Sequence, residues 1–572
     1  MIRYNVRFKN PHRHFVSFEA VFPTSGKSQI KLQLAAWRPG RYELGNFSKN
    51  IRGWEARDKH NNKLQFTKVT KDLWQVDCKD LSEVTICYEY YAAELNAGST
   101  FLDEEQLYIN PVNCFFYDKD NDQLPYQISF DLPETYDIAC GLKQLNRNTL
   151  HAGNFDELAD SPLIASATMK KFDYQSGGVS FGIRIQGEVP IDHNKFVEEC
   201  KKFTDYQIKL FGDIPCDTYL YLFQFTSQFQ RHGVEHHNST VIAMGPASDF
   251  QSEALYKDLL GITCHELFHT WNIKSIRPVE MQPYDFTKEN YTKLGYVAEG
   301  VTTYYGDLIL WQTGSFNHTD WMNVLSENIK SHFDNHGRFN LSVADSGFDT
   351  WLDGYSAGIP WRKVSIYNEG FLIALIMDIY IMSASGGTRS LDDAMRILYN
   401  DFGKKEKGYT ESDYRTIINS LSDNTTEEIF TNLVYGVNDY KPYLDKALGL
   451  LNLEIQIAPS SKVSESQFGF STDETSGRCI VTGIAENGPA DNGGLWYGDE
   501  IIAVNQTGFG KNFQLLLRMN GREITLEIMR KNKRKQITLQ TDTPTYYNKY
   551  TVVAGADYQT NKLAHYWKNR IS

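Results

Sequence analysis

Two histidines and a glutamate near the middle of the chain have the spacing of a metal site. His265, Glu266 and His269 read H-E-x-x-H. On a helix, residues four apart lie on the same face, so both imidazoles can reach one ion. Glu266 is then placed to act as a general base on a water at the ion's open position. The motif predicts a zinc hydrolase with one Zn²⁺ ion, although five residues can also match by chance.

A catalytic zinc takes a third protein ligand and leaves its fourth position to water. Two downstream carboxylates compete for this role. Glu289 follows His269 by twenty residues, in a stretch without helical periodicity, whereas Glu299 follows it by thirty, at the start of a predicted helix closed by Gly314. A helix holds a ligand more rigidly than a loop does, which favours Glu299. Glu289 stays open as the alternative.

The elements that must position these residues follow from hydrophobic periodicity. Residues 1–175 alternate between apolar and polar positions, which predicts an antiparallel β-sandwich-like domain with a supporting role. Residues 176–452 change to helical periodicity and form the predicted catalytic domain. Its expected helices run from Asp192 to about Leu210, from Ser252 to Asn272, from Glu299 to about Gln312, and from Val364 to Met382.

Short strands return after the helical part. Residues 453–545 contain Phe468-Gly469-Phe470 and a strand entered through Gly498-Asp499, and this pattern resembles a PDZ domain. Residues 546–572 are too aromatic for a solvated tail and are expected to pack on another domain. The predicted fold class is therefore a multidomain α+β protein with an N-terminal antiparallel β domain, a mainly helical catalytic domain and a C-terminal PDZ domain.

Composition narrows the possible partners. A net charge of −13 over 572 residues argues against a general nucleic-acid surface. We expect no membrane span, since no apolar run approaches the roughly 20 residues that one requires. The start lacks an apolar signal region, which predicts a cytoplasmic protein, with a periplasmic location as the alternative for a processed form. The eight cysteines form no C-x-x-C pair and are expected to be free thiols.

The segment that begins at Glu299 also carries a resemblance. Residues 299–305 look like the E-G-x-x-x-Y segment of gluzincin aminopeptidases. Together with the PDZ-like region and residues 37–42 (W-R-P-G-R-Y), they resemble the PDZ-containing glycyl aminopeptidase family, which is related to aminopeptidase N. This resemblance implies a thermolysin-like catalytic domain, Glu299 as the third zinc ligand, and peptide substrates with a small first residue such as glycine or alanine.

Two more motifs are similar to that family. Gly233-Val234-Glu235-His236 resembles G-G-x-E-H, which implies that Glu235 binds the substrate's free amino group and that Gly233 lies beside the substrate. Val234 departs from the pattern, and a solvated loop carboxylate is the alternative for Glu235. Residues 364–370 resemble S-Y-Y-x-K-G, which implies that Tyr367 assists catalysis at the oxyanion. Ile366 and Glu369 depart from that pattern, and a core aromatic is the alternative for Tyr367.

The predicted function is a zinc-dependent aminopeptidase that acts on peptides with a free N-terminus. A zinc endopeptidase is the alternative within enzymes. A PDZ-based binding protein with a non-catalytic metal is the alternative from another class. The PDZ-like region could bind a peptide C-terminus by strand addition or could only brace the catalytic domain, and the sequence favours neither.

Overall fold

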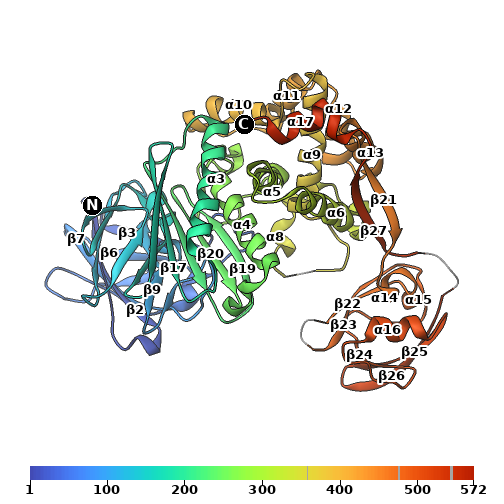
Figure 1. Ribbon diagram of the computed structural model, residues 1–572. Coiled ribbons are helices and arrows are strands. Elements are labelled where there is room, and N and C mark those ends of the chain that lie inside the picture. Colours follow the sequence, from blue (N-terminus) through green and yellow to red (C-terminus); the bar gives the residue numbers. More distant parts are fainter. Residues whose placement is uncertain (357, 475–476, 542–544, 572) are drawn as a thin grey trace. The chain divides into compact units, whose positions relative to one another are not determined.

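The computed structural model describes residues 1–572 except 357, 475–476, 542–544 and 572 (Figure 1). The excepted residues fall partly in the predicted PDZ range and tail, and those parts lie outside the described residues. Two compact units are found: unit 1 comprises Met1–Trp321, Gly337–Ala447 and Lys562–Ser572, and unit 2 comprises Met322–His336 and Leu448–Asn561. Strand-rich and helical parts both occur, so the predicted multidomain α+β fold class is confirmed.

The N-terminal part of unit 1 consists of three β-sheets. The largest has the order β13 (Lys143–Asn146), β14 (Thr149–Ala152), β11 (Tyr126–Asp131), β1 (Ile2–Phe8), β2 (Phe15–Pro23), β7 (Glu83–Tyr91) and β4 (Ile51–Arg57). The second contains β10 (Phe116–Asp118), β3 (Gln29–Leu34), β6 (Leu73–Asp77) and β5 (Phe66–Lys68). The third contains β12 (Asp137–Cys140), β15 (Leu163–Ser166), β9 (Gln106–Ile109) and β8 (Phe101–Leu102). The pairing is antiparallel as predicted, except that β1 and β11 run parallel.

The alternating residues of these strands form one apolar core. Inward positions such as Val84, Ile86 and Tyr88 on β7 are buried, whereas the residues between them are partly exposed. The period-two pattern therefore predicted the buried face of the domain correctly, since successive side chains on a strand point to opposite faces.

A mixed five-stranded sheet begins the catalytic part. Its order is β16 (Lys170–Ser176), β17 (Val179–Gln186), β18 (Thr218–Phe225), β20 (Ser239–Gly245) and β19 (Gln230–Glu235). The helix α3 (His193–Phe211) follows β17, and the Asp192 carboxylate accepts from the backbone N–H of Asn194 and Lys195, which is the N-cap predicted for it. Residues 230–235 form an edge strand, although their polar sequence reads as a loop. They do so because β19 pairs antiparallel with the apolar strand β20.

Four helices position the candidate site: α4 (Glu253–Phe268), α5 (Thr302–Thr313), α9 (Ile366–Ala384) and α10 (Leu391–Asp401). α4 ends four residues before the predicted Asn272. The chain turns there, since the buried Trp271 donates through its indole N–H to Asp213 O and Ile273 takes a positive φ of 110°. A π-helical turn, Tyr296–Val301, precedes α5 and contains Glu299. Gly314 ends α5 in the left-handed conformation, as the sequence predicts.

One described helix, α9, is long and apolar enough by composition to cross a membrane. Its most apolar window has a mean hydropathy of 1.3, but 83% of that window is buried inside the structure. This is the environment of a core helix.

Unit 2 contains the PDZ-like region. Its five-stranded sheet has the order β22 (Phe470–Asp473), β23 (Cys479–Ile484), β24 (Glu500–Val504), β25 (Glu523–Arg530) and β26 (Lys533–Gln540). The helix α16 (Phe513–Met519) buries Phe513 and Leu517 in the same core. A separate ribbon pairs β21 (Leu453–Pro459) with β27 (Asn548–Ala554).

The end of the chain returns to unit 1. There α17 (Lys562–Asn569) buries the whole side chain of Trp567. The aromatic tail is thus packed, as its composition indicates. All eight cysteines lie within the described residues, and none forms a disulfide.

Candidate metal centre and active site

Three side chains converge where α4 meets the π-helical turn. The Nε2 atoms of His265 and His269 lie 3.0 Å apart, and Glu299 Oε2 lies 3.7 Å from the first and 3.4 Å from the second. His269 and Glu299 are buried and His265 is nearly so. The structure therefore brings together the three residues that the sequence nominates as metal ligands. Glu289 lies in an irregular segment and belongs to neither group of potential metal ligands among the described residues.

The spacing of these ligand atoms fits a tetrahedral ion. Ligands 2.0–2.2 Å from a tetrahedral Zn²⁺ lie about 3.3–3.6 Å from one another. The 3.4 Å from Glu299 Oε2 to His269 lies in this range, and the other two separations, 3.7 and 3.0 Å, lie within about 0.3 Å of it. Two imidazole nitrogens and one carboxylate oxygen form the donor set of a catalytic zinc site with a fourth position for water. The residues present therefore fit a single zinc ion.

Backbone and side-chain contacts orient the second histidine. His269 Nδ1 donates to Asn272 O at 2.8 Å, which directs Nε2 toward the other ligands. The Asn272 side chain in turn donates to Val297 O at 2.8 Å and to Thr302 Oγ1 at 3.0 Å. Asn272 thus connects the end of α4 to the turn that carries Glu299. The sequence gives no signal for this role.

A tyrosine from the N-terminal β domain also contacts the metal ligands. Tyr42 Oη donates to Glu299 Oε1 at 2.9 Å, which leaves Oε2 to face the histidines. Burial, together with the charge of Glu299, raises the pKa of Tyr42 well above its ordinary value, so the phenol stays a donor. Residues 37–42 support the family resemblance, but no spacing in the sequence indicates that Tyr42 contacts a metal ligand.

Removing the Tyr42 hydroxyl should weaken metal binding. Loss of a hydrogen-bond partner of a ligand typically reduces metal affinity about 10- to 100-fold, and we expect Tyr42→Phe to raise the zinc dissociation constant by about this factor. Competition with a chromogenic chelator measures it. Tyr136→Phe is the matched control, since Tyr136 Oη donates to Glu104 O at 3.0 Å in the same domain. Equal zinc affinity in wild type and Tyr42→Phe would contradict this role.

The pKa of each of the three ligands depends on the charge of at least one of the others. Burial opposes the charge on His269, but the carboxylates of Glu299, Glu235 and Glu266 outweigh it and raise the His269 pKa to about 10. Burial lowers the pKa of His265 to about 4. Although burial disfavours its charge, Glu299 keeps its pKa well below the usual range because both histidines hydrogen-bond to it. Without metal, His269 therefore carries a proton at neutral pH.

This proton makes metal binding pH-dependent. A metal ion binds only unprotonated imidazole, so Zn²⁺ must displace the His269 proton at any pH below about 10. Affinity should therefore rise with pH, by about tenfold per unit between pH 5 and pH 7. Titration calorimetry in two buffers of different ionisation enthalpy should detect at least one proton released per ion. An affinity that does not change with pH would contradict the assignment.

Two further carboxylates face the metal ligands. Glu235, at the end of the edge strand β19, and Glu266, on α4, each have an oxygen within 4.8 Å of the other and of a His269 nitrogen. They are 7% and 5% exposed, and Glu266 Oε2 has no hydrogen-bond partner among the described residues. Burial and the charges of Glu235 and Glu299 raise the pKa of Glu266 to about 8. Two buried acids side by side favour a cation between them.

Gly233 allows β19 to approach α4. A Cβ atom at this position would lie 2.0 Å from Glu266 Oε1, so any larger residue would displace the carboxylate. Gly233 and Glu235 point to the same face of the strand because they are two residues apart. The strand thus places both residues beside Glu266.

Asp160 supports the residues that follow Glu235. Its Oδ1 accepts from His236 Nδ1 at 3.0 Å and from Lys274 Nζ at 2.8 Å, and its Oδ2 accepts from His237 N at 2.9 Å. Burial disfavours the charge of Asp160, but Lys274 and His236 hold its pKa well below the usual range. Asp160 is distant in sequence from every motif, so no spacing could have identified it.

Tyr367 lies in the first turn of α9 and is 40% exposed. A tyrosine hydroxyl with an ordinary pKa of about 10 is protonated at neutral pH, so Tyr367 can donate a hydrogen bond. Trp351 packs against Trp37 and Tyr42 at ring distances of 5.6 and 6.0 Å.

Converging imidazoles and a carboxylate, with a buried acid beside them, define the site of a metallopeptidase. Three regions of the chain match family models: residues 3–167 match the Peptidase M61 N-terminal domain, residues 258–373 the M61 glycyl aminopeptidase, and residues 456–540 the PDZ domain. The M61 models match both the N-terminal region and the catalytic region, so the resemblance inferred from the motifs is confirmed.

A solved structure shares the fold. This crystal structure is described as an aminopeptidase N family protein from Idiomarina loihiensis. It is 22% identical to this chain and superposes with a TM-score of 0.91, and the match covers 100% of each chain. At this identity the likeness shows the fold alone. An M1 zinc metallopeptidase from Deinococcus radiodurans is 12% identical with a TM-score of 0.47, covering 77% of this chain and 94% of that one. A comparison with curated proteins found no match.

Proposed function

We propose that this metallopeptidase is a zinc-dependent aminopeptidase that removes a small N-terminal residue from peptides. The observation that carries the proposal is the pair of buried acids beside the metal ligands, Glu235 and Glu266. Glu266 has a role in any hydrolase of this type. Glu235 does not, and its carboxylate has no ion-pair partner among the described residues. An ammonium group is the cation that a peptide with a free N-terminus supplies.

Each side chain near the metal has a separate role. Bound by His265, His269 and Glu299, Zn²⁺ would polarise the scissile carbonyl and acidify the attacking water. The charge of the bound ion would favour the ionised form of Glu266, whose carboxylate takes the proton from that water and transfers it to the leaving amine. Tyr367 donates its hydroxyl hydrogen to the oxygen that becomes negative in the transition state. Glu235 pairs with the terminal ammonium and so fixes the first peptide bond as the one cleaved.

The preference for a small first residue rests on the family description rather than on a measured pocket. The description names a glycyl aminopeptidase, and glycine or alanine is the corresponding expectation.

For the PDZ domain we propose binding of a peptide C-terminus along β22, an edge strand of its sheet. Bracing of the catalytic domain remains the competing role.

One experiment tests the function. Zinc content and hydrolysis of glycyl, alanyl and leucyl amides are measured with and without chelator, beside peptides with free and acetylated N-termini. We expect one zinc per chain, faster release of glycine and alanine than of leucine, and no cleavage of the acetylated peptide. Equal cleavage of free and acetylated peptides would favour the endopeptidase alternative. Hydrolysis that persists without metal would overturn the proposal.

A further inference from the structure

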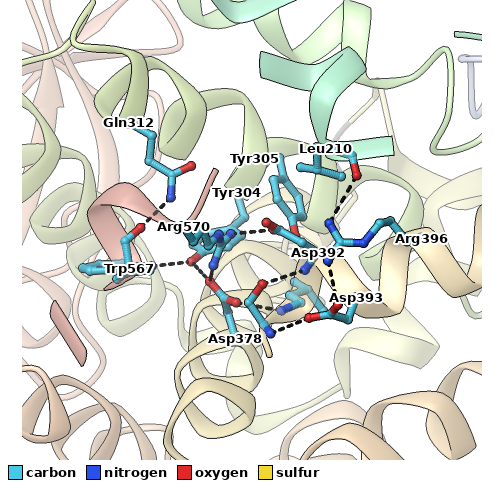
Figure 2. A network of polar contacts seen from close by, with 12 residues as sticks. Leu210, Tyr304, Tyr305, Gln312, Asp378, Asp392, Asp393, Arg396, Trp567 and Arg570 are labelled. Carbon is cyan, nitrogen blue, oxygen red and sulfur yellow. Dashed lines mark hydrogen bonds and ion pairs between the residues drawn. The ribbon is translucent and has the colours of Figure 1, made fainter. Parts of the chain in front are cut away.

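Two side chains near the end of the chain, those of Trp567 and Arg570, are buried in unit 1 (Figure 2). Trp567, on α17, packs against Trp311 and Trp321 with ring centroids 5.1 and 5.6 Å away. Its indole N–H donates to Tyr304 Oη at 3.0 Å. Three residues later, the side chain of Arg570 is 1% exposed. The C-terminal segment is therefore an integral part of the helical domain.

Arg570 joins two buried carboxylates from different helices. Its guanidinium lies 2.6 Å from Asp378 on α9 and 2.8 Å from Asp392 on α10, and these carboxylates are at most 3% exposed. Among the described residues no other Lys, Arg or His forms an ion pair with either. Arg396 nearby pairs with Asp393 instead. A buried carboxylate without a counter-charge is strongly destabilising, so Arg570 is required where it lies.

The same two carboxylates also hold α5. Tyr304 Oη donates to Asp378 Oδ2 at 2.6 Å, and Tyr305 Oη donates to Asp392 Oδ1 at 2.7 Å. Figure 2 shows both tyrosines and both aspartates around the arginine. Arg570 is thus the centre of a network that connects α5, α9 and α10.

One chain of contacts connects this network to α4, the helix that carries His265 and ends just before His269. The ring of Tyr305 stacks on that of Phe268 with centroids 4.6 Å apart and planes 13° from parallel. Phe268 is the last residue of α4 and directly precedes His269. A displacement of Tyr305 would therefore press on the turn that carries the second histidine.

A second route runs through α9. Gly300, next to Glu299, packs on Gly370 so closely that a Cβ at Gly300 would lie 2.3 Å from Gly370 Cα. α9 and the π-helical turn are therefore in backbone contact, three residues from Tyr367. Close-packed backbones cannot shift independently, so a shift of α9 would also move the turn that carries Glu299.

We propose that Arg570 is a positioning residue for the reaction. Through Asp378 and Asp392 it fixes the spacing of α5 and α9, and thereby the positions of Glu299 and Tyr367 relative to the histidines of α4. The inference rests on the proposed function and extends it to Arg570, a residue far in sequence from the catalytic motifs.

Arg570→Met tests the inference in the full-length protein. We expect a folded protein whose zinc dissociation constant rises about tenfold, the lower end of the effect of residues that support ligands. At saturating zinc, kcat should fall while KM for a glycyl amide changes less than threefold, since Tyr367 acts only in the transition state. Arg570→Lys keeps the charge but not the fork that spans two carboxylates, and should lie between wild type and Arg570→Met.

Arg530→Met is the matched control. Arg530 pairs with Asp499 at 2.6 Å in the PDZ domain, and their side chains are 10% and 2% exposed. This variant should lose stability in that domain while zinc affinity and kcat stay at the wild-type values. It thus distinguishes the effect of losing any buried ion pair from the effect of losing the Arg570 ion pairs.

Arg570→Met with wild-type zinc affinity and kcat would overturn the inference. If Arg570→Met does not fold, the triple variant Arg570→Met/Asp378→Asn/Asp392→Asn decides, because it leaves no buried charge unpaired. The triple variant should still bind zinc more weakly, and wild-type affinity there would overturn the inference as well. A wild-type chain that neither binds zinc nor cleaves glycyl amides would instead count against the proposed function.

Discussion

Glu266→Gln should bind zinc as wild type does and lose nearly all activity. The substitution keeps the shape of the side chain and leaves His265, His269 and Glu299 in place. It removes the group that accepts the water proton, and general-base catalysis typically contributes about 10²- to 10⁴-fold. We therefore expect kcat to fall by about this factor, with close to one zinc per chain by elemental analysis.

His269→Ala is the complementary variant. It deletes one of the three ligand atoms, so zinc and activity should be lost together. A Glu266→Gln enzyme that keeps activity within tenfold of wild type would reject the general-base assignment. Loss of zinc from Glu266→Gln would instead indicate that the carboxylate is a ligand.

Glu235→Gln should weaken the recognition of a free N-terminus. A charge-assisted hydrogen bond in a buried site contributes about 2–3 kcal/mol, so kcat/KM for glycyl amide should fall roughly 30- to 150-fold. The ammonium is held before and during the reaction, and most of the loss should therefore be a higher KM. Initial rates over a range of substrate concentrations measure the split.

Glu289→Gln is the control for this prediction. Glu289 was the alternative third ligand and lies in an irregular segment outside the converging groups. Its variant should keep wild-type kinetics and zinc content. If Glu235→Gln matched wild type on glycyl amide, Glu235 would have no role in binding the amino group, and the endopeptidase alternative would regain support.

The sequence was most informative where one local pattern was sufficient. Two histidines four apart predict a shared helix face, and alternation along β7 predicts a half-buried strand, because each depends only on the geometry of its own element. Gly314 and Asp192 likewise end and begin helices through contacts within one turn. These predictions hold in the structure.

Features that depend on long-range contacts were missed. Tyr42 reaches Glu299 across 257 residues of sequence, and Asp160 reaches His236 across 76. No periodicity reports such pairs, since only the tertiary fold brings them together. The edge strand β19 reads as a polar loop, because its pairing with β20 decides its conformation. The π-helical turn at Glu299 was also missed, and such turns frequently mark functional sites.

The division of the chain into units has a practical consequence for gene design. The PDZ-like region lies between segments of unit 1, because residues 562–571 return to the unit that contains the catalytic helices. A stop codon placed after residue 545 would discard Trp567 and Arg570 together with the tail. An internal deletion within the PDZ match, residues 456–540, would spare them. The PDZ region can thus be removed only from inside the chain, because truncation from the C-terminus would expose the side chains that contact Trp567 and leave Asp378 and Asp392 without Arg570.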